Sequence, residues 1–153
     1  MPVLHTCLLE DGELAMAYPL VRSVARVGLD RWLEFACAVS AAQGGTLVAR
    51  ARGGCLYGAA TFLPQPSLEY GRVLGIEILA AFELGRVPHA DHALRKGLAK
   101  FARERGCAAL AYTLPAAEHP GVRRINLCGT RIVSMEPVAP PGRIVLPARA
   151  RGL

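Results

Sequence analysis

The chain has 153 residues, of which 52% are apolar and 20% are charged, and its formal net charge is +6. This length suits one compact domain with a sizeable core, and the apolar fraction is too high for a disordered chain. The sequence has no run of about 18 uncharged apolar residues that could span a membrane, and its start lacks the pattern of a secretory signal. With five scattered cysteines and no C-x-x-C pair, the composition predicts a cytoplasmic protein with reduced thiols and no zinc site.

The positive charge is concentrated toward the C-terminus. Residues 121–153 contain six arginines and one glutamate, whereas the first 120 residues are nearly neutral. Such a segment could attract a nucleotide, a phosphorylated cofactor or nucleic acid, or it could be a solvated basic edge with a loose tail. The arginines do not alternate with aromatic residues as a base-stacking surface requires, so we expect no nucleic acid partner.

Two helices are predicted in the first third of the chain. Across residues 13–27, apolar side chains recur at spacings of three and four, at Leu14, Tyr18, Val21 and Ala25. Asp30 is placed to cap a second helix, which runs through Val39 and ends at Gly44-Gly45.

Strands are expected next. Residues 46–51 and 56–62 flank Arg52-Gly53-Gly54 and predict a hairpin, and the prolines that follow predict a loop at 64–67. Residues 72–82 predict one mostly buried strand, in which Glu77 interrupts the apolar pattern.

The second half of the chain predicts a helix between two strands. The helix begins at Pro88, runs to Arg105 and is capped by Gly106. Residues 107–114 then predict an apolar strand suited to a central, parallel position. Two short strands are expected at 131–135 and 143–146.

This order of elements predicts a mixed α/β (α+β) fold, with a central, mostly antiparallel mixed sheet flanked by helices in a single domain. We expect the domain to span residues 1–147 and residues 148–153 to form a short basic tail. An exposed strand at 143–146 could pair between the subunits of a homodimer.

The segment from Glu77 to Cys107 resembles the GCN5-related N-acetyltransferase (GNAT) superfamily. In that family a strand, a loop of the pattern Q/R-x-x-G-x-G/A and a helix hold acetyl-CoA, with the pyrophosphate on the loop amides and the helix N-terminus. The matching loop here is Arg86-Val87-Pro88-His89-Ala90-Asp91. The residues after it are similar to the family's A-L-L-x-x-L-x-x-x-A-R-x-x-G-C helix.

The resemblance implies a GNAT-like domain that takes acetyl-CoA or another acyl-CoA as co-substrate, with no metal. The strand backbone would bind the pantetheine arm like an added strand, and the loop and helix would hold the pyrophosphate. The residues at these positions are Leu79, Ala80, Ala81, Arg86, Val87, His89, Ala90, Asp91 and Leu94.

Two loop positions depart from the family pattern. His89 and Asp91 stand where the family has small residues, and Asp91 brings a carboxylate to the expected position of the diphosphate. At about 4 Å and an effective dielectric constant near 20, repulsion between two unit charges is on the order of 4 kcal/mol. Asp91 could instead turn away and cap the helix, and a protonated His89 would compensate in part.

Glu77 and Tyr112 are the catalytic candidates. Glu77 lies where the family often has an acidic residue, and apolar neighbours would raise its pKa toward that of a general base; alternatively, it faces an edge and pairs with an arginine such as Arg72. Glu83 is a second candidate for the base. The family's tyrosine acid corresponds here to Ile125, so Tyr112 on the preceding strand is the nearest substitute, unless its side chain points into the core.

The sequence therefore leads to two main hypotheses for the function. The first is an acyl-CoA-dependent N-acyltransferase, expected to be an acetyltransferase, that moves the acyl group to a small-molecule or peptide amine by direct attack on the thioester. The alternative is a catalytically inactive GNAT-fold binding or regulatory protein that has lost acetyl-CoA binding. A third hypothesis, an acyl-CoA-dependent lactone-signal synthase, rests only on Glu83-Leu84-Gly85-Arg86, which is similar to that family's E-L-S-R motif.

Overall fold

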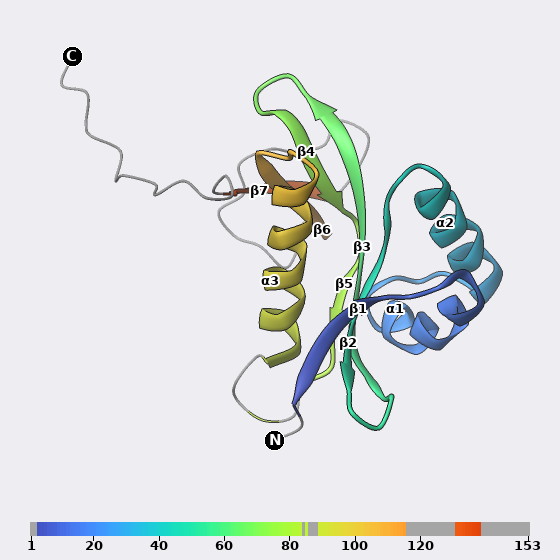
Figure 1. Ribbon diagram of the computed structural model, residues 1–153. Helices are drawn as coiled ribbons and strands as arrows, with labels where there is room; N and C mark the ends of the chain where they lie inside the picture. Colours follow the sequence, from blue (N-terminus) through green and yellow to red (C-terminus); the bar gives the residue numbers. More distant parts are fainter. Residues whose placement is uncertain (1–2, 84, 86–88, 116–130, 139–153) are drawn as a thin grey trace, which may run out of the picture.

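A computed structural model describes residues 3–83, 85, 89–115 and 131–138 of the chain (Figure 1). None of the helices in this part is long and apolar enough to cross a membrane. The elements, in chain order, are β1 (Leu4–Leu8), the 3-10 helix η1 (Asp11–Ala17), α1 (Tyr18–Val24), α2 (Leu29–Ala41), β2 (Gly45–Ala51), β3 (Leu56–Ser67), β4 (Gly71–Ile76), β5 (Leu79–Ala81), α3 (His89–Glu104), β6 (Ala109–Pro115) and β7 (Arg131–Pro137).

The strands form one seven-stranded sheet in the order β1-β2-β3-β4-β6-β7, and β5 pairs with β3 beyond the end of β4. Neighbouring strands are antiparallel except β4 and β6, which are parallel. Helix α3 covers one face of the sheet, and η1, α1 and α2 cover the other (Figure 1). These features confirm the expected mixed, mostly antiparallel sheet flanked by helices.

The core has one apolar layer on each face of the sheet. On the α3 side, Leu94 and Leu98 pack against sheet residues such as Leu47 and Leu74. On the other side, Trp32 of α2 is 2% exposed, and its indole N–H donates to the Leu14 carbonyl at 2.8 Å. The helical spacings seen in the sequence therefore mark faces that are buried against the sheet.

The first predicted helix is divided in the structure. Residues 11–17 form η1 and residues 18–24 form α1, and Pro19 lies in the first turn of α1. Proline has no N–H to donate, so it starts a new helix more easily than it continues an old one. Asp30 is not the cap of α2, because Gly28 is the N-cap residue and Asp30 lies in the first turn, where its charge favours the helix dipole.

The predicted hairpin between β2 and β3 is confirmed, but the predicted loop at 64–67 is wrong. Strand β3 continues to Ser67 and forms a second hairpin with β4. Pairing of β3 with β2 ends at Phe62. From Leu63 onward β3 pairs with β4 alone, so only every second residue of β3 must donate its N–H to the sheet. Pro64 and Pro66 alternate with Gln65 and are compatible with such an edge.

The predicted strand at 72–82 is two strands, β4 and β5, with a β-bulge between them. Opposite β4, Leu63 faces Gly75, whereas opposite β5, Ala60 faces Leu79, so the register shifts by one residue at Glu77 and Ile78. The buried Thr61 closes the bulge: its hydroxyl accepts a hydrogen bond from the Ile78 N–H at 3.3 Å, and its own N–H donates to the Ile78 carbonyl at 3.0 Å. An alternating apolar pattern does not reveal such a one-residue insertion.

The expectations for the second half are confirmed where residues are described. Helix α3 ends at Glu104, Gly106 follows with φ +69°, and β6 is parallel to β4. Strand β7 pairs with β6 along its whole length. The expected strand at 143–146, its homodimer contact and the tail at 148–153 lie outside the described residues.

Gly44 is required by packing at the end of α2. The left-handed residue there is Gln43, with φ +68°. A Cβ on Gly44 would lie 2.2 Å from the Phe62 carbonyl oxygen and 2.7 Å from a Val39 methyl group. The glycine therefore lets α2 turn directly into the sheet.

We expect Gly44→Ala to lower the free energy of unfolding by roughly 1–3 kcal/mol, because backbone atoms must move to admit the methyl group. Gly12→Ala is the control, since a Cβ on Gly12 would have no atom of another part of the chain within 4 Å. Urea unfolding of both variants measures the difference, and equal stability of the two would contradict this account.

Candidate functional site

The bulge brings two consecutive side chains to the same face of the sheet. Leu74 and Ile76 of β4 face α3, and after the bulge Leu79 does so too. Glu77 and Ile78 both line a cavity on the other side, beneath α1 and α2. In a regular strand these two residues would point to opposite faces. The bulge therefore turns the apolar side chain of Ile78 to the same face as the Glu77 carboxylate.

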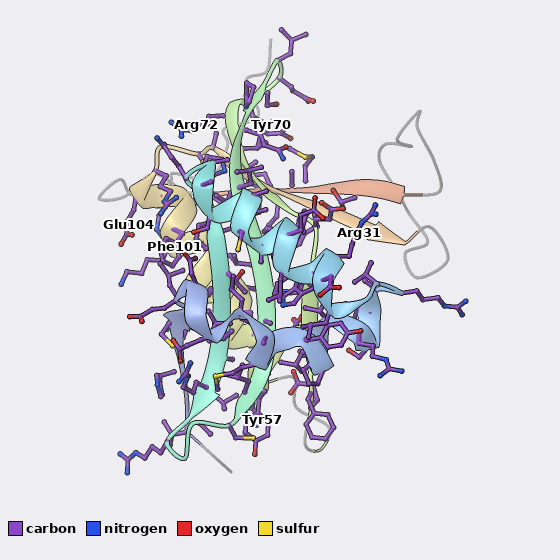
Figure 2. The ribbon with its side chains drawn as sticks, turned by 90° about the vertical axis from the view of Figure 1, so that its right-hand side faces the viewer. Arg31, Tyr57, Tyr70, Arg72, Phe101 and Glu104 are labelled. Atoms are coloured by element: carbon purple, nitrogen blue, oxygen red, sulfur yellow. The ribbon has the colours of Figure 1, made fainter. Side chains whose placement is uncertain are left out.

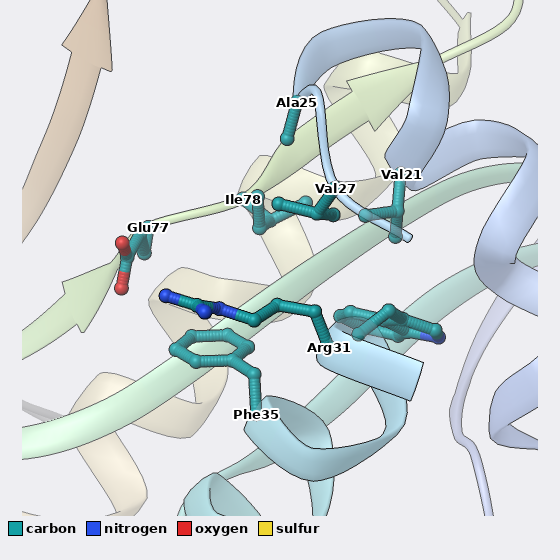
Figure 3. Close-up of a pocket in the computed structure, with 8 residues that line it drawn as sticks. Val21, Ala25, Val27, Arg31, Phe35, Glu77 and Ile78 are labelled. Carbon is teal, nitrogen blue, oxygen red and sulfur yellow. The ribbon is translucent and has the colours of Figure 1, made fainter. Parts of the chain in front are cut away.

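The cavity has a volume of about 240 Å³ and lies between α2, the segment that follows α1, and the bulge. Its walls include Val21, Trp32 and Phe35, and Glu77 and Arg31 are its charged lining residues. Figure 3 shows the Arg31 side chain running beside Phe35 with its guanidinium toward Glu77. The Glu77 side chain is exposed at this opening, so the apolar enclosure expected from the sequence is absent.

Strand β5 has a strand partner on one edge only within the described part of the chain. Leu79, Ala80 and Ala81 pair with Ala60, Ala59 and Gly58 of β3, and no other strand of the described chain pairs with them. The last parallel pair between β4 and β6 joins Ile76 to Tyr112. Beyond that pair, β5 stays with β3 and β6 continues with β7. The sheet therefore divides next to the bulge.

The N-terminus of α3 is capped by a carboxylate of the chain itself. The amide N–H groups of Ala90 and Asp91 donate to the Glu83 carboxylate at 3.3 and 2.8 Å. The Asp91 side chain points along the helix and pairs with Arg95 at 2.8 Å. Asp91 therefore turns away from the N-terminus, as the sequence allowed, but Glu83 and not Asp91 is the residue that caps the helix. Glu83 provides the negative charge that a helix N-terminus favours.

The other predicted cofactor residues are only partly placed. Arg86 and Val87 lie outside the described residues. His89 is exposed at the first position of α3, whereas Ala90 and Leu94 are fully buried beneath the helix. Leu94 packs on Gly58 of β3, which lies opposite Ala81 of β5. A Cβ on Gly58 would lie 2.7 Å from a methyl carbon of Leu94. Leu94 therefore sets the distance between α3 and the sheet.

Tyr112 lies in the core between the sheet and α3. Its side chain is 2% exposed, and its hydroxyl has no hydrogen-bond partner within the described chain. The Arg95 guanidinium lies 4.7 Å from the centre of its ring. Burial raises the pKa of Tyr112 to about 12, against the opposing attraction of Arg95. Of the two orientations that the sequence allows, the one toward the core is therefore observed.

The structure gives one residue of the site a contact that the sequence did not predict, and it adds a residue that the sequence did not single out. Glu83 is a candidate base from its position in the chain, but its carboxylate caps α3. Arg31 is missed, because a charged residue in the first turn of an amphipathic helix is usually solvated. The sequence does contain one sign that Arg31 lies near the site. Arg31 precedes the buried Trp32 in α2, and a residue next to a core residue of a helix lies at the rim of the buried face.

No family model matches the sequence, and no curated protein matches it either. Solved structures do match. Ribosomal-protein-alanine N-acetyltransferase from Brucella melitensis biovar Abortus 2308 is 25% identical, with a TM-score of 0.62 over 76% of this chain and 83% of that one.

Two further structures were determined with a ligand. An aminoglycoside N-acetyltransferase in complex with CoA is 13% identical, with a TM-score of 0.69 over 83% of this chain and 94% of that one. The protein yncA from Salmonella typhimurium, with its cofactor acetyl-CoA, is 11% identical, with a TM-score of 0.64 over 95% of this chain and 99% of that one. Together with the strand order and the divided sheet, these likenesses show that the chain has the fold of the GNAT superfamily.

Proposed function

We propose that the protein is an acyl-CoA-dependent N-acyltransferase that transfers an acyl group, expected to be acetyl, to an amine. The observation that carries this proposal is the division of the sheet at the bulge, which places the unpaired edge of β5 beside the cavity that holds Glu77. Structures of the same fold hold CoA or acetyl-CoA. The named activities of two similar structures, on ribosomal-protein alanine and on aminoglycosides, involve amine acceptors.

The residues of this chain fit the pantetheine arm of an acyl-CoA. The N–H and C=O groups of Leu79, Ala80 and Ala81 on the unpaired edge of β5 can bind the amides of that arm as an added strand would. This contact requires only backbone, so the side chains there are not restricted to one sequence. When bound, the acyl-CoA supplies a thioester whose carbonyl carbon is open to attack by an amine.

The N-terminus of α3 fits a pyrophosphate only after one change. Two of its amides, those of Ala90 and Asp91, already donate to Glu83, and two anions cannot share the same N–H groups. Glu83 must therefore leave these amides before a phosphate can use them. Asp91 presents less of an obstacle, because its carboxylate is held by Arg95. Arg86 and His89 are proposed to add positive charge to this site.

Glu77 is proposed to act as the general base, directly or through a water molecule. It takes a proton from the acceptor ammonium, the amine nitrogen forms a bond to the thioester carbon, and the carbon–sulfur bond breaks. The nitrogen loses its second proton as the amide forms, the leaving thiolate sulfur takes up one proton, and the products are an amide and free CoA, with one proton released to solvent from Glu77. The assignment of Tyr112 as the acid remains a prediction, and its burial favours a core role.

The alternative function is a GNAT-fold binding or regulatory protein without transferase activity. The Glu83 cap is the observation that favours it, because a helix N-terminus that is satisfied from within the chain has less need of a phosphate. CoA binding separates the two proposals.

Isothermal titration with acetyl-CoA and with CoA tests the transferase directly, and micromolar binding is the expected result. We expect Glu83→Gln to bind CoA roughly five-fold more tightly, since the competing cap is worth about 1 kcal/mol and about 1.4 kcal/mol is a tenfold change. The same variant should unfold at a lower temperature. Glu34→Gln, on the exposed side of α2, is the control. If neither the unaltered protein nor Glu83→Gln binds CoA or acetyl-CoA, the transferase proposal is overturned in favour of the alternative.

Replacement of Glu77 by glutamine should lower kcat by roughly 10²–10⁴-fold, because loss of a general base has effects of this size. The affinity for CoA should stay within about two-fold of the unaltered protein, since Glu77 lies on the cavity side of the bulge. Steady-state kinetics and calorimetry measure the two quantities. Unchanged turnover would remove Glu77 from the mechanism.

Tyr112→Phe tests both the acid role and the effect of burial. Because the folded pKa of about 12 lies above the ordinary value of 10.0, the unfolded chain loses this proton first as the pH rises. The stability that comes from neutral Tyr112 is therefore full below about pH 10 and is lost toward about pH 12, at about 1.4 kcal/mol per pH unit. The phenylalanine variant should not show this loss of stability. Urea unfolding of both proteins across this alkaline range measures the difference.

The comparison with the unaltered protein also cancels the contribution of Cys107, whose thiol pKa is raised by burial. Near neutral pH the phenylalanine variant should be as stable or more stable, because an unpartnered buried hydroxyl is removed. Turnover should be retained. A fall in kcat of about a hundredfold with unchanged stability would instead assign the proton transfer to Tyr112.

A further inference from the structure

The cavity beneath α2 combines a small apolar chamber with two opposite charges. Its apolar walls come from α1, the segment after it, α2 and the bulge, and include Val21, Val27, Phe35 and Ile78. Its volume of about 240 Å³ lies below the roughly 300–1,000 Å³ of pockets that take drug-sized ligands. The cavity therefore suits a compact ligand with a short apolar part.

The charged groups stand on opposite walls of the opening. Glu77 comes from the bulge and Arg31 from the first turn of α2, and Figure 3 shows their side chains extending toward one another above Phe35. Both residues are exposed, so each can exchange its present surroundings for a ligand. A carboxylate recognises an ammonium group, and a guanidinium recognises a carboxylate through two parallel hydrogen bonds.

We propose that the acceptor is a free amino acid with a small apolar side chain. Its ammonium group would face Glu77, its carboxylate would bind Arg31, and its side chain would enter the chamber toward Val21 and Trp32. This inference rests on the proposed transferase function and adds to it the substrate class. Arg31 is then a specificity-determining residue, and Glu77 both binds the amine and receives its proton.

The carboxylate requirement separates this acceptor from other amines. L-Leucine, L-leucinamide and 3-methylbutylamine share the side chain and the amine, but only leucine has a carboxylate. In an assay of CoA thiol release from acetyl-CoA, kcat/KM for leucine should exceed that for the other two by about tenfold or more. Equal values for leucine and leucinamide would overturn the proposal while leaving the transferase intact.

Substitution of Arg31 tests the assigned contact. Arg31→Met should raise KM for leucine by roughly ten- to a hundred-fold and bring the ratio of kcat/KM for leucine to kcat/KM for leucinamide close to one, whereas Arg31→Lys should restore part of the preference. Arg26→Gln is the matched control, because Arg26 is exposed in the same region and does not line the cavity. A preference for leucine that persists in Arg31→Met would contradict the role of Arg31.

A second readout does not depend on turnover. Trp32 is the one tryptophan of the chain and lines the cavity, so its fluorescence should change on titration with leucine and stay constant with leucinamide. The titration is done with and without free CoA. A leucine-dependent change in a protein that binds no CoA would support the ligand class and refute the transferase. No change under either condition would refute the ligand class.

Discussion

The one-residue bulge opposite Thr61 determines the arrangement of the candidate site. Thr61 is buried and exchanges two hydrogen bonds with Ile78, one through its side chain and one through its backbone. The inserted residue brings Glu77 and Ile78 to the same face of the sheet and separates β5 from the line of β4. Without it, the chain would continue as one regular strand, and Glu77 and Ile78 would point to opposite faces of the sheet.

The N-terminus of helix α3 presents atoms for which a capping side chain and a bound anion would compete. A helix N-terminus has N–H groups without partners inside the helix, and either a side chain or a bound anion can satisfy them. In this structure Glu83 does so, and Asp91 is drawn toward Arg95. Arg95 also contacts the ring of Tyr112 and lies 3.9 Å from Glu136 of β7. The charges around α3 therefore join the helix to the β6–β7 side of the sheet.

Much of the fold was predictable from the sequence, because long elements carry a repeated signal. The apolar spacing in α2 and α3, the glycines at 53, 54 and 106, and the apolar run of β6 each predicted the observed element. Figure 2 shows the result, with α1 and α2 lying across the face of the sheet opposite α3. The continuation of β3 through two prolines was not predictable, because a strand accepts prolines only where their missing N–H groups face an unpaired edge. The position of that edge depends on where β2 stops pairing with β3.

The candidate site was less predictable for a related physical reason. Glu77 stood out as a charge in an apolar strand, but the bulge that orients it depends on Thr61, a residue far away in the sequence. The Glu83 cap joins residues that are seven and eight positions apart in the sequence, whereas local capping patterns span about three. Tyr112 was named for its chemistry, and its burial came from packing against α3. Each of these features depends on a contact between segments that no local pattern specifies.

The prolines of β3 have a consequence for how the molecule meets its neighbours in solution. Past Phe62, the side of β3 that β2 leaves unpaired is an edge to which another extended chain could add, and such edges are common starting points for aggregation. Pro64 and Pro66 remove two of the N–H groups that an incoming strand would need. The exposed hairpin is thereby protected against uncontrolled strand addition, while β5 has no proline and keeps its backbone N–H groups.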